Sequence, residues 1–435
     1  WSDMDSARIL RKIDWRLLPI LTLAYVLSFL DRANIGNSKL MHLEADLNLS
    51  QAEYSWSLSI LFISYVLLEI PSNLMLKRMR PSHWLGFITI CWGILASCMA
   101  ANSGTASILI IRFLLGAAEA GFVPGVLYFL TYWYRPTEIA IRMAIFLSAI
   151  TLAGALGGIL AFAIGHMEGV GGLAAWRWLF LLEGIPTLIM GVCLALFLPD
   201  GPTQVKCDPP AAKNAANSRP SPPTSDIAAA PRLSNWAAIV AVFLNYRCHL
   251  HALIHICTVI PSYSVQFLLS TVIKELGFDS LSAQLLTVPA HFCGAVFMIS
   301  MAYHSDRVKE RGFHITFAAG LGALGFLLVT FVSGRIAKYL MLLIVGMGVN
   351  GFLALNTAWV SGNVVEKTQR GVAMAFVVSF GNIGGLAAGQ MYRNSEAPQY
   401  MTSHLVNTAC LLTVATLSMV LKFLLRRENR LLDQQ

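Results

Sequence analysis

The chain has 435 residues, of which 56% are hydrophobic and only 12% are charged, and its mean hydropathy is +0.63. Soluble domains contain about 25% charged residues, so this composition excludes an ordinary soluble globular protein and indicates a chain mostly immersed in lipid. The formal net charge of +8 would suit a nucleic-acid-binding protein, but the distribution of the basic residues favours an explanation from membrane topology.

Residues 1–16 form a charged segment before the first apolar run, with Arg8, Arg11, Lys12 and Arg16. No short apolar region with a small-residue cleavage site follows them, so we predict no cleaved signal peptide. The first span then serves as its own insertion signal.

Twelve apolar stretches have about the 20 residues that a membrane-crossing helix needs. The predicted spans lie near 17–37, 54–76, 83–102, 107–131, 139–165, 176–198, 248–273, 281–303, 314–333, 338–361, 371–391 and 403–425. Ser50 and Glu53 form a capping box that opens the second span. We therefore predict an all-α integral membrane protein with twelve transmembrane helices.

A polar interval divides these spans into two sets of six. Residues 201–232 are rich in Pro, Ala, Ser and Asn, which predicts a flexible linker. We therefore expect an N-terminal half over 17–198, a cytoplasmic linker over 199–247, a C-terminal half over 248–425 and a cytoplasmic tail over 426–435.

The two halves carry a weak internal repeat. Asn73 precedes Arg78 by five residues in the loop after the second span, and Asp306 precedes Arg311 by five in the loop after the eighth. Two parallel six-helix halves packed around a midplane site describe the major facilitator architecture, which is the predicted fold.

The basic residues alternate between the two sides of the predicted bundle. With the spans above, 22 of the 31 Lys and Arg residues fall in the two terminal segments and the even-numbered loops, and six fall in the opposite loops. The positive-inside rule then places both termini in the cytoplasm. The bilayer accounts for the basic charge, so we expect no nucleic-acid partner.

Four charged residues lie where lipid should exclude them. Asp31 and Arg32 close the apolar run 17–30, and Arg112 and Glu119 lie inside the run 107–130. Residues seven apart lie within about 20° of each other around a helix, so Arg112 and Glu119 share a face. An ionisable group in hydrocarbon costs roughly 2.5–3.5 kcal/mol and normally faces a bundle interior or a wet cavity. Acid and base together suggest a proton site beside an anion site.

Two structural alternatives stay open for these residues. Asp31 and Arg32 could lie in the outer loop, and Arg112 with Glu119 could be an ion pair that only locks two helices together. Glu69 is a further acid near the cytoplasmic end of the second span, where gating, capping or proton carriage are all possible roles.

Amides gather in the tenth and eleventh predicted spans of the second half. They are accompanied by an aromatic residue, and the set is Asn350, Asn356, Trp359, Asn363, Asn382 and Gln390. Each could bond a neighbouring helix, but several in adjacent spans favour the wall of a polar cavity.

His249, His251 and His255 form the sequence HLHALIH, in which two histidines four residues apart could share a metal. Membrane di-iron enzymes use several such boxes and this chain offers one, so the end of a helix at the membrane interface is the favoured interpretation. The eight cysteines include no CxxC pair. We expect neither a metal nor another cofactor.

Several stretches together are similar to a known family. They are LDRANIGNSKL (30–40), YVLLEIPSNLMLKRMRPSHW (65–84), RFLLGAAEAGFVPGVLYFLTYWYRPTE (112–138), WRWLFLLEGIPT (176–187), SDRVKERG (305–312), NTAWVSGNVVEKTQR (356–370) and SFGNIGGLAAGQMYR (379–393). The chain resembles the fungal allantoate permease group of the anion:cation symporters, within the major facilitator superfamily.

The resemblance implies proton-coupled uptake of an organic anion such as allantoate, nicotinate, pantothenate, biotin or another monocarboxylate. By position, Asp31 and Glu119 would handle protons, while Arg32, Arg112 and Asn382 would contact the substrate. Asn356 and Trp359 join the substrate-contacting set as members of the polar cavity wall. We assign gating and loop-motif roles to Glu69, Asn73, Arg78, Asp306, Arg307 and Arg311.

Two stretches depart from the family pattern. The segment after LPDGPTQVK becomes Pro- and Ala-rich, and span 7 reads Leu268-Leu269-Ser270-Thr271 where the family usually has FLPT. The lost proline removes a residue that favours a bend.

We therefore predict a monomeric plasma-membrane importer that works by alternating access, and no enzyme activity. Three alternatives remain. They are a metabolite or drug exporter of the same fold, a nutrient receptor that binds without transport, and a membrane redox enzyme built on the histidine cluster.

Overall fold

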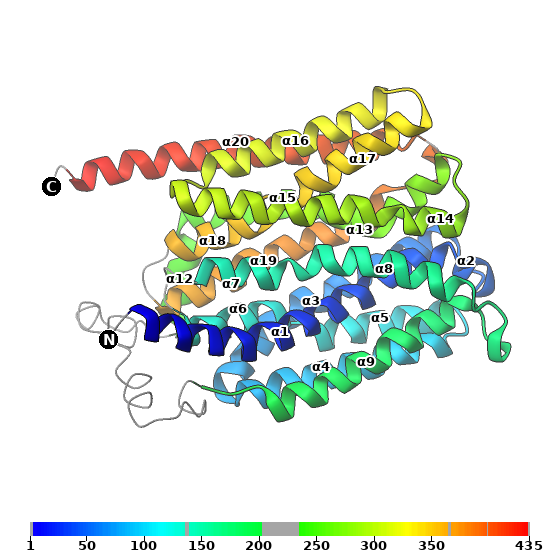
Figure 1. The fold of residues 1–435 in the computed structure, drawn as a ribbon, viewed down its shortest axis with the longest axis horizontal. Coiled ribbons are helices and arrows are strands. Elements are labelled where there is room, and N and C mark those ends of the chain that lie inside the picture. The colour runs from blue at the N-terminus through cyan, green and yellow to red at the C-terminus, as the bar shows by residue number, and fades with distance from the viewer. Residues whose placement is uncertain (1–2, 135–138, 202–234, 364–366, 398, 434–435) are drawn as a thin grey trace.

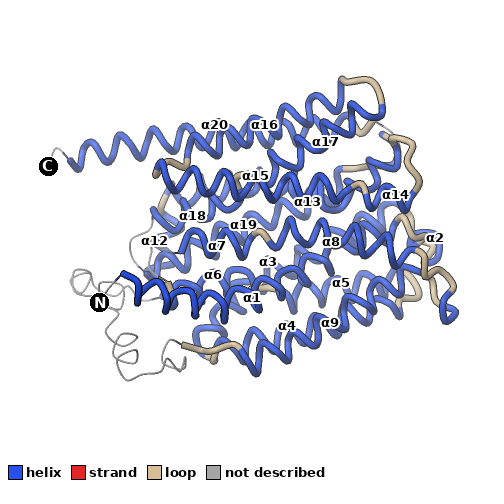
Figure 2. Tube along the Cα trace, viewed as in Figure 1, coloured by secondary structure: helices blue, strands red, loops and turns tan. Residues whose placement is uncertain are grey.

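The computed structural model describes residues 3–134, 139–201, 235–363, 367–397 and 399–433. Within these residues every regular element is a helix, as Figure 2 shows. This agrees with the all-α prediction, because a backbone in hydrocarbon must satisfy its hydrogen bonds within each segment.

The first half contains nine α-helices among the described residues. They are α1 (Asp3–Lys39), α2 (Leu43–Asp46), α3 (Gln51–Arg78), α4 (Pro81–Cys98), α5 (Thr105–Glu119), α6 (Phe122–Trp133), α7 (Ile139–Leu147), α8 (Ala149–Gly165) and α9 (Ala175–Phe197). The Ser50 hydroxyl accepts from the Glu53 N–H while the Glu53 carboxylate accepts from the Ser50 N–H, which confirms the capping box that opens α3.

The second half contains nine further α-helices in the same described part of the chain. They are α12 (Asn235–Leu244), α13 (Tyr246–Glu275), α14 (Ser280–Leu285), α15 (Thr287–Val308), α16 (Gly312–Phe331), α17 (Arg335–Asn350), α18 (Leu353–Asn363), α19 (Lys367–Met391) and α20 (Met401–Asp433).

Eleven helical segments of the described chain are long and apolar enough to cross a membrane, and α13 makes the twelfth if its two bent parts count as one span. The parts of α13, Tyr246–Phe267 and Leu269–Glu275, meet at an angle of 55°. The bend therefore forms without the proline that the family pattern would place there. Four other spans consist of two consecutive α-helices each, such as α5 with α6.

Most of the predicted linker, residues 202–234, lies outside the described residues. Its last part is helical, since α12 occupies 235–244 and packs on α19. The ten-residue run NWAAIVAVFL is apolar but too short for a membrane span, so its apolar length alone predicted no helix there. The predicted tail is helical as far as Asp433, because α20 continues beyond the span.

The helices of each half lie together, and the two halves pack along their length (Figure 1). In the first half α4 packs on α9 and α3 on α5, and in the second α13 packs on α19 and α16 on α20. The halves meet where α3 packs on α19, α8 on α15, and α1 on α13. Both chain ends lie at one end of the bundle (Figure 1), which we call the terminal end.

The halves are in close contact toward the opposite end. The Ser59 hydroxyl of α3 donates to the Leu386 carbonyl at 3.1 Å, and the Gln390 amide donates to Ser59 at 2.9 Å. Gly36 of α1 approaches the α13 backbone so closely that a Cβ atom there would lie 2.5 Å from the Phe267 carbonyl oxygen. A side chain at position 36 would therefore push the halves apart.

Toward the terminal end the packing leaves space. A cavity of about 120 Å³ lies between α3, α6, α12 and α19, and Asn73, Tyr128, Phe243 and Ser379 are among the residues that line it. The described conformation is thus closed at the end opposite the termini and less tightly packed at the terminal end.

Candidate functional site

A break in the fourth span positions Glu119. Helix α5 ends at Glu119, Ala120 is extended, and Gly121 has a φ of +83° before α6 begins at Phe122. Only glycine adopts this left-handed backbone readily. The interrupted helix brings the Glu119 carboxylate to the face of α1 that carries Ser28 and Arg32.

The acid and base of the first span lie within α1, because the helix continues to Lys39. Asp31 and Arg32 are each 3% exposed, which excludes the outer-loop alternative. Consecutive residues of a helix point about 100° apart. Arg32 accordingly lines the central cavity, whereas Asp31 Oδ2 lies within hydrogen-bond distance of Thr187 Oγ1 of α9, at 3.2 Å.

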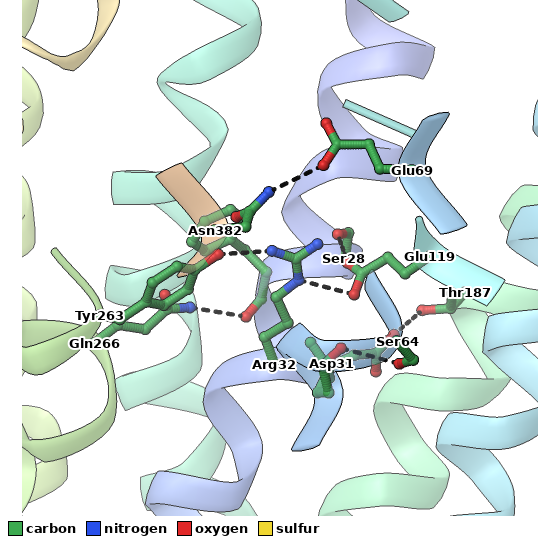
Figure 3. A network of polar contacts seen from close by, with 12 residues as sticks. Ser28, Asp31, Arg32, Ser64, Glu69, Glu119, Thr187, Tyr263, Gln266 and Asn382 are labelled. Atoms are coloured by element: carbon green, nitrogen blue, oxygen red, sulfur yellow. Dashed lines mark hydrogen bonds and ion pairs between the residues drawn. The ribbon is translucent and has the colours of Figure 1, made fainter. Parts of the chain in front are cut away.

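Arg32 is the centre of the polar network in Figure 3. Its Nε donates to Glu119 Oε2 at 2.8 Å and its Nη1 donates to the Tyr263 hydroxyl at 2.7 Å. The guanidinium carbon lies 4.7 Å from the centre of the Tyr65 ring and 5.6 Å from that of Phe29. Aromatic faces attract the cation. Arg32 Nη2 is buried and has no hydrogen-bond partner among the described residues.

Glu119 completes an ion pair whose two side chains are each 3% exposed. Its second oxygen, Oε1, accepts from the Ser28 hydroxyl. Removal of one member of such a pair leaves an uncompensated buried charge, which is strongly unfavourable. Any process that neutralises Glu119 therefore changes the state of Arg32.

Arg112 takes a different direction from Glu119, although both belong to α5. Its Nε donates to the Ser57 carbonyl of α3 at 3.1 Å, and it is 1% exposed. Arg112 is outside the lining of the central cavity in this conformation, so its substrate contact remains a prediction.

The central cavity has a volume of about 80 Å³ and is lined by both halves. The first half contributes Arg32 with the aromatic residues Tyr25, Phe29 and Tyr65. The polar lining from the second half comprises His255, Ser262, Tyr263, Gln266, His291, Asn350, Thr357 and Asn382. The cavity thus combines one buried cation, aromatic faces and neutral polar groups that can donate and accept hydrogen bonds.

Three polar contacts join the halves beside this cavity (Figure 3). Tyr263 accepts from Arg32, Gln266 Nε2 donates to the Phe29 carbonyl at 3.2 Å, and Asn382 Nδ2 donates to Glu69 Oε2 at 3.5 Å. The structure therefore brings Asn382 to the cavity and Glu69 to Asn382, and both residues lie inside candidate membrane spans, Gln51–Leu76 and Val372–Met391.

Asn356 and Trp359 lie behind the cavity wall, with the histidines of α13. Asn356 Oδ1 is 3.3 Å from His251 Nδ1, and Asn356 Nδ2 is 3.5 Å from His255 Nδ1. The Trp359 ring meets His251 edge-on at 5.4 Å. Substrate contact by Asn356 and Trp359 stays a prediction. Among the described residues no three His, Cys, Asp or Glu side chains meet as a metal site would require.

The loop-motif residues lie toward the terminal end. Asn73 Nδ2 donates to the Glu69 carbonyl at 3.0 Å and lines the terminal-end cavity, while Arg78 is exposed. Asp306 and Arg311 form an ion pair at 3.8 Å. The Arg307 guanidinium lies over the Tyr303 ring at 4.5 Å. Gating by these residues remains a prediction.

Two residues of this region escaped the sequence analysis. Glu183 of α9 is 3% exposed and accepts from Asn34 Nδ2 at 2.7 Å. An acid inside an apolar span is the same signal that identified Glu119, so Glu183 could have been found. Tyr263 carried no such signal, since an aromatic residue in a span is ordinary and only tertiary packing brings its hydroxyl to Arg32.

Comparisons with known proteins agree with this architecture. Residues 21–389 match the family described as the Major Facilitator Superfamily. A relative from a fungus (Fungal sp.), named MFS transporter prlL, is 33% identical over 437 residues, which cover 98% of this chain and 88% of the relative. An Agrobacterium vitis protein with the provisional name of a tartrate transporter is 32% identical over 89% of this chain and 84% of its own length.

Two solved structures share the fold at low sequence identity. A bacterial homologue of the human lysosomal transporter Spinster, inward-facing and occupied, has a TM-score of 0.67 at 16% identity and covers 93% of this chain and 96% of its own. A D-xylose-proton symporter has a TM-score of 0.67 at 15% identity and covers 93% of this chain and 97% of its own.

Proposed function

The chain belongs to the Major Facilitator Superfamily and is a multi-pass membrane transporter, and we propose that it imports a small organic anion together with protons. The family and the fold are those of transporters and not of enzymes. Coupling to protons, the class of substrate and the direction of transport are the proposed parts.

The observation that carries the proposal is the state of Arg32. It lines the central cavity, is buried, and has one guanidinium nitrogen, Nη2, without a partner among the described residues. A carboxylate bound to this fork gains charge-assisted hydrogen bonds that are roughly twice as strong as neutral ones. Once Glu119 is protonated, the buried Arg32 cation has no ionic partner, which favours an anionic substrate over a neutral one.

Glu119 supplies the coupling to protons. Arg32 donates to the ionised Glu119 carboxylate at 2.8 Å. Protonation of Glu119 removes this negative charge, so Arg32 becomes free to pair with the substrate carboxylate. One proton and one anion then enter the site together, and its net charge does not change. Binding of the anion without the proton would place two negative charges beside one cation, which the low-dielectric interior disfavours.

The two halves would move against each other and so open this site alternately to the two sides of the membrane. The positive-inside rule puts the termini in the cytoplasm, so the close contacts of Gly36 and Ser59 lie at the outer face. The described conformation is then inward-facing. The substrate would release the contact between Arg32 and Tyr263 by competing for the guanidinium.

The class of substrate is proposed from three lines of support. The cavity offers one cation and several neutral hydrogen-bonding groups, as a small polar carboxylate requires. The sequence resembles organic-anion symporters. Relatives carry provisional names as a tartrate transporter and, in Pseudomonas putida, as the metabolite transport protein NicT, the latter 32% identical over 90% of this chain and 89% of the relative.

Proteoliposomes that contain purified protein and a trapped pH-sensitive dye test this proposal. We expect that an inward proton gradient drives accumulation of at least one of allantoate, nicotinate, pantothenate and tartrate, with substrate-dependent acidification of the lumen. Neutral D-xylose is the control and should not accumulate. Accumulation of D-xylose but of no carboxylate, or accumulation of a carboxylate without proton movement, would contradict the proposal.

A further inference from the structure

A second pair of buried acids lies behind the anion site, between α1 and α9. Asp31 and Asn34 are three residues apart on α1, and Glu183 and Thr187 are four apart on α9, so each pair shares a helix face. All four side chains are at most 3% exposed. The central cavity is lined by other residues, so this cluster is separate from the place of the anion.

The contacts of Thr187 indicate the protonation state of Asp31. The Thr187 Oγ1 atom lies 3.2 Å from Asp31 Oδ2 and 2.9 Å from the Glu183 carbonyl oxygen. A hydroxyl has only one hydrogen to donate. If Asp31 is protonated, it donates to Thr187 while Thr187 donates to the carbonyl, and both contacts become hydrogen bonds. If Asp31 is ionised, one of the two contacts joins two acceptors with no hydrogen between them.

The surroundings of Glu183 also favour the protonated form of its carboxyl group. Its Oε2 accepts from Asn34 Nδ2 at 2.7 Å, and its Oε1 is buried without a partner among the described residues, as is Asp31 Oδ1. An isolated ionised carboxylate in such surroundings is very costly, so a buried acid of this kind takes up a proton. An amide can donate to a carboxylate and accept from a carboxylic acid. Asn34 therefore remains a partner for Glu183 in both protonation states.

The charges around Asp31 and Glu183 also disfavour two ionised carboxylates. Asp31 interacts electrostatically with Glu183, Glu119 and Arg112, and Arg32 already has Glu119 as its ionic partner. Helix α8 contributes no titratable side chain to the packing on α1 and α9, and α4 contributes only His83, Cys91 and Cys98. Two ionised carboxylates here would lack a cation in hydrogen-bond contact, and one would repel the other.

We propose that Asp31 and Glu183 form a second proton-binding site of the transporter, in which Glu183 shares the proton load with Asp31 during the transport cycle. This inference rests on the proposed proton coupling and extends it. Protons add to Asp31 Oδ2, the oxygen in contact with Thr187, and to the free Glu183 Oε1. They leave to water when a conformational change opens the interface between α1 and α9. Glu119 couples anion binding to the uptake of one proton, whereas Asp31 and Glu183 carry additional protons across the membrane in each transport cycle.

Infrared spectroscopy of the purified protein in lipid tests this site without any substrate. Glu183→Gln has nearly the same shape as the protonated acid, and Asp31→Asn is the second variant. At neutral pH we expect each variant to lose part of the carbonyl absorption of protonated carboxyl groups. Glu275→Gln, at an exposed acid, is the matched control and should leave that absorption unchanged. Unchanged absorption in Glu183→Gln would overturn the inference.

The ratio of protons to anions moved supplies the second readout. It is obtained from initial rates of lumenal acidification and uptake of the radiolabelled carboxylate that the wild type accumulates. We expect Glu183→Gln to move one proton fewer per anion, a change that mere structural damage would not produce. A wild-type ratio in this variant would contradict the inference. Absence of proton movement in the wild type would instead contradict the proposed function, and the infrared bands would still decide whether Glu183 binds a proton.

Discussion

The Arg32 guanidinium of α1 donates to the Tyr263 hydroxyl of α13 at 2.7 Å. This bond joins the proposed anion site of the first half directly to the second half. The Tyr263 ring also lies 4.7 Å from Phe62 and 6.3 Å from Phe29, both of the first half. If a substrate occupies the Arg32 guanidinium, the hydrogen bond to Tyr263 is weakened, and with it this contact between the two halves.

Tyr263→Phe keeps these ring contacts and removes the hydroxyl. A hydrogen bond to a charged group contributes about 1.5–3 kcal/mol, so we expect the variant to populate the described conformation at least about tenfold less, relative to the alternative state. Distances between spin labels at the end opposite the termini measure this population. An unchanged distance distribution would show that the bond does not hold the halves together.

Arg32→Lys retains the positive charge but loses the planar fork that binds a carboxylate in two places. We expect the affinity for the transported anion to fall about 10- to 100-fold, as the loss of one charge-assisted hydrogen bond implies. Binding is measured by isothermal calorimetry on the purified protein. Arg430→Lys, at an exposed residue of α20, is the control. Equal affinities for Arg32→Lys and wild type would place the anion elsewhere.

Gly36→Ala should shift the protein away from the described conformation. The new Cβ would lie 2.5 Å from the Phe267 carbonyl oxygen, closer than atoms of this kind can approach, so the outer contact must loosen. We expect increased labelling of a cysteine introduced at Ser59 in a background without native cysteines. Gly320→Ala is the control, since nothing lies within 4 Å of its added Cβ. Labelling at the control level would mean that the helices adjust without opening.

Glu310 lies outside the membrane-spanning segments, and its contacts should make the stability of the folded protein depend on pH. Burial raises the pKa of Glu310, but the contacts with Lys422, the Phe313 N–H and His314 outweigh it and lower the pKa below its ordinary value of 4.5. Because the folded-state pKa is depressed, the stabilisation is present above pH 4.5 and is lost as the pH falls through the folded pKa. Glu310→Gln should therefore melt at a lower temperature than the wild type at pH 7.

The difference in melting temperature between Glu310→Gln and the wild type should shrink as the pH falls below 4.5, as differential scanning fluorimetry would show. The exposed Glu275→Gln serves as the control at each pH. A difference that stays constant at all pH values would assign the effect to packing instead of charge.

The spans and the buried charges could be predicted because hydrocarbon imposes a strong rule on composition. Apolar length located the helices, and the cost of charge in lipid identified Asp31, Arg32, Arg112 and Glu119. The pairing within this set could not be read from spacing. Arg112 and Glu119 share a helix, yet Glu119 pairs with Arg32, because the break at Ala120 and Gly121 and the packing of α1 determine the direction of the carboxylate.

Which amides of the second half line the central cavity was harder to predict, for the same reason. Asn382 lines the central cavity, while Asn356 faces the histidines behind it. Both are amides in apolar spans, and only the rotation of each helix in the bundle distinguishes them. Helix rotation follows from packing between halves that are distant in the sequence, for which a single sequence contains no direct signal.

In the proposed mechanism, protonation of Glu119 frees Arg32 for the anion. Glu119→Gln mimics the protonated acid permanently, so its Arg32 is always free. In proteoliposomes we expect this variant to exchange labelled for unlabelled anion by counterflow at a rate close to that of the wild type. An imposed proton gradient should drive much less accumulation than in the wild type, because Glu119 no longer carries a proton with each anion. Full accumulation driven by the proton gradient in Glu119→Gln would contradict the account.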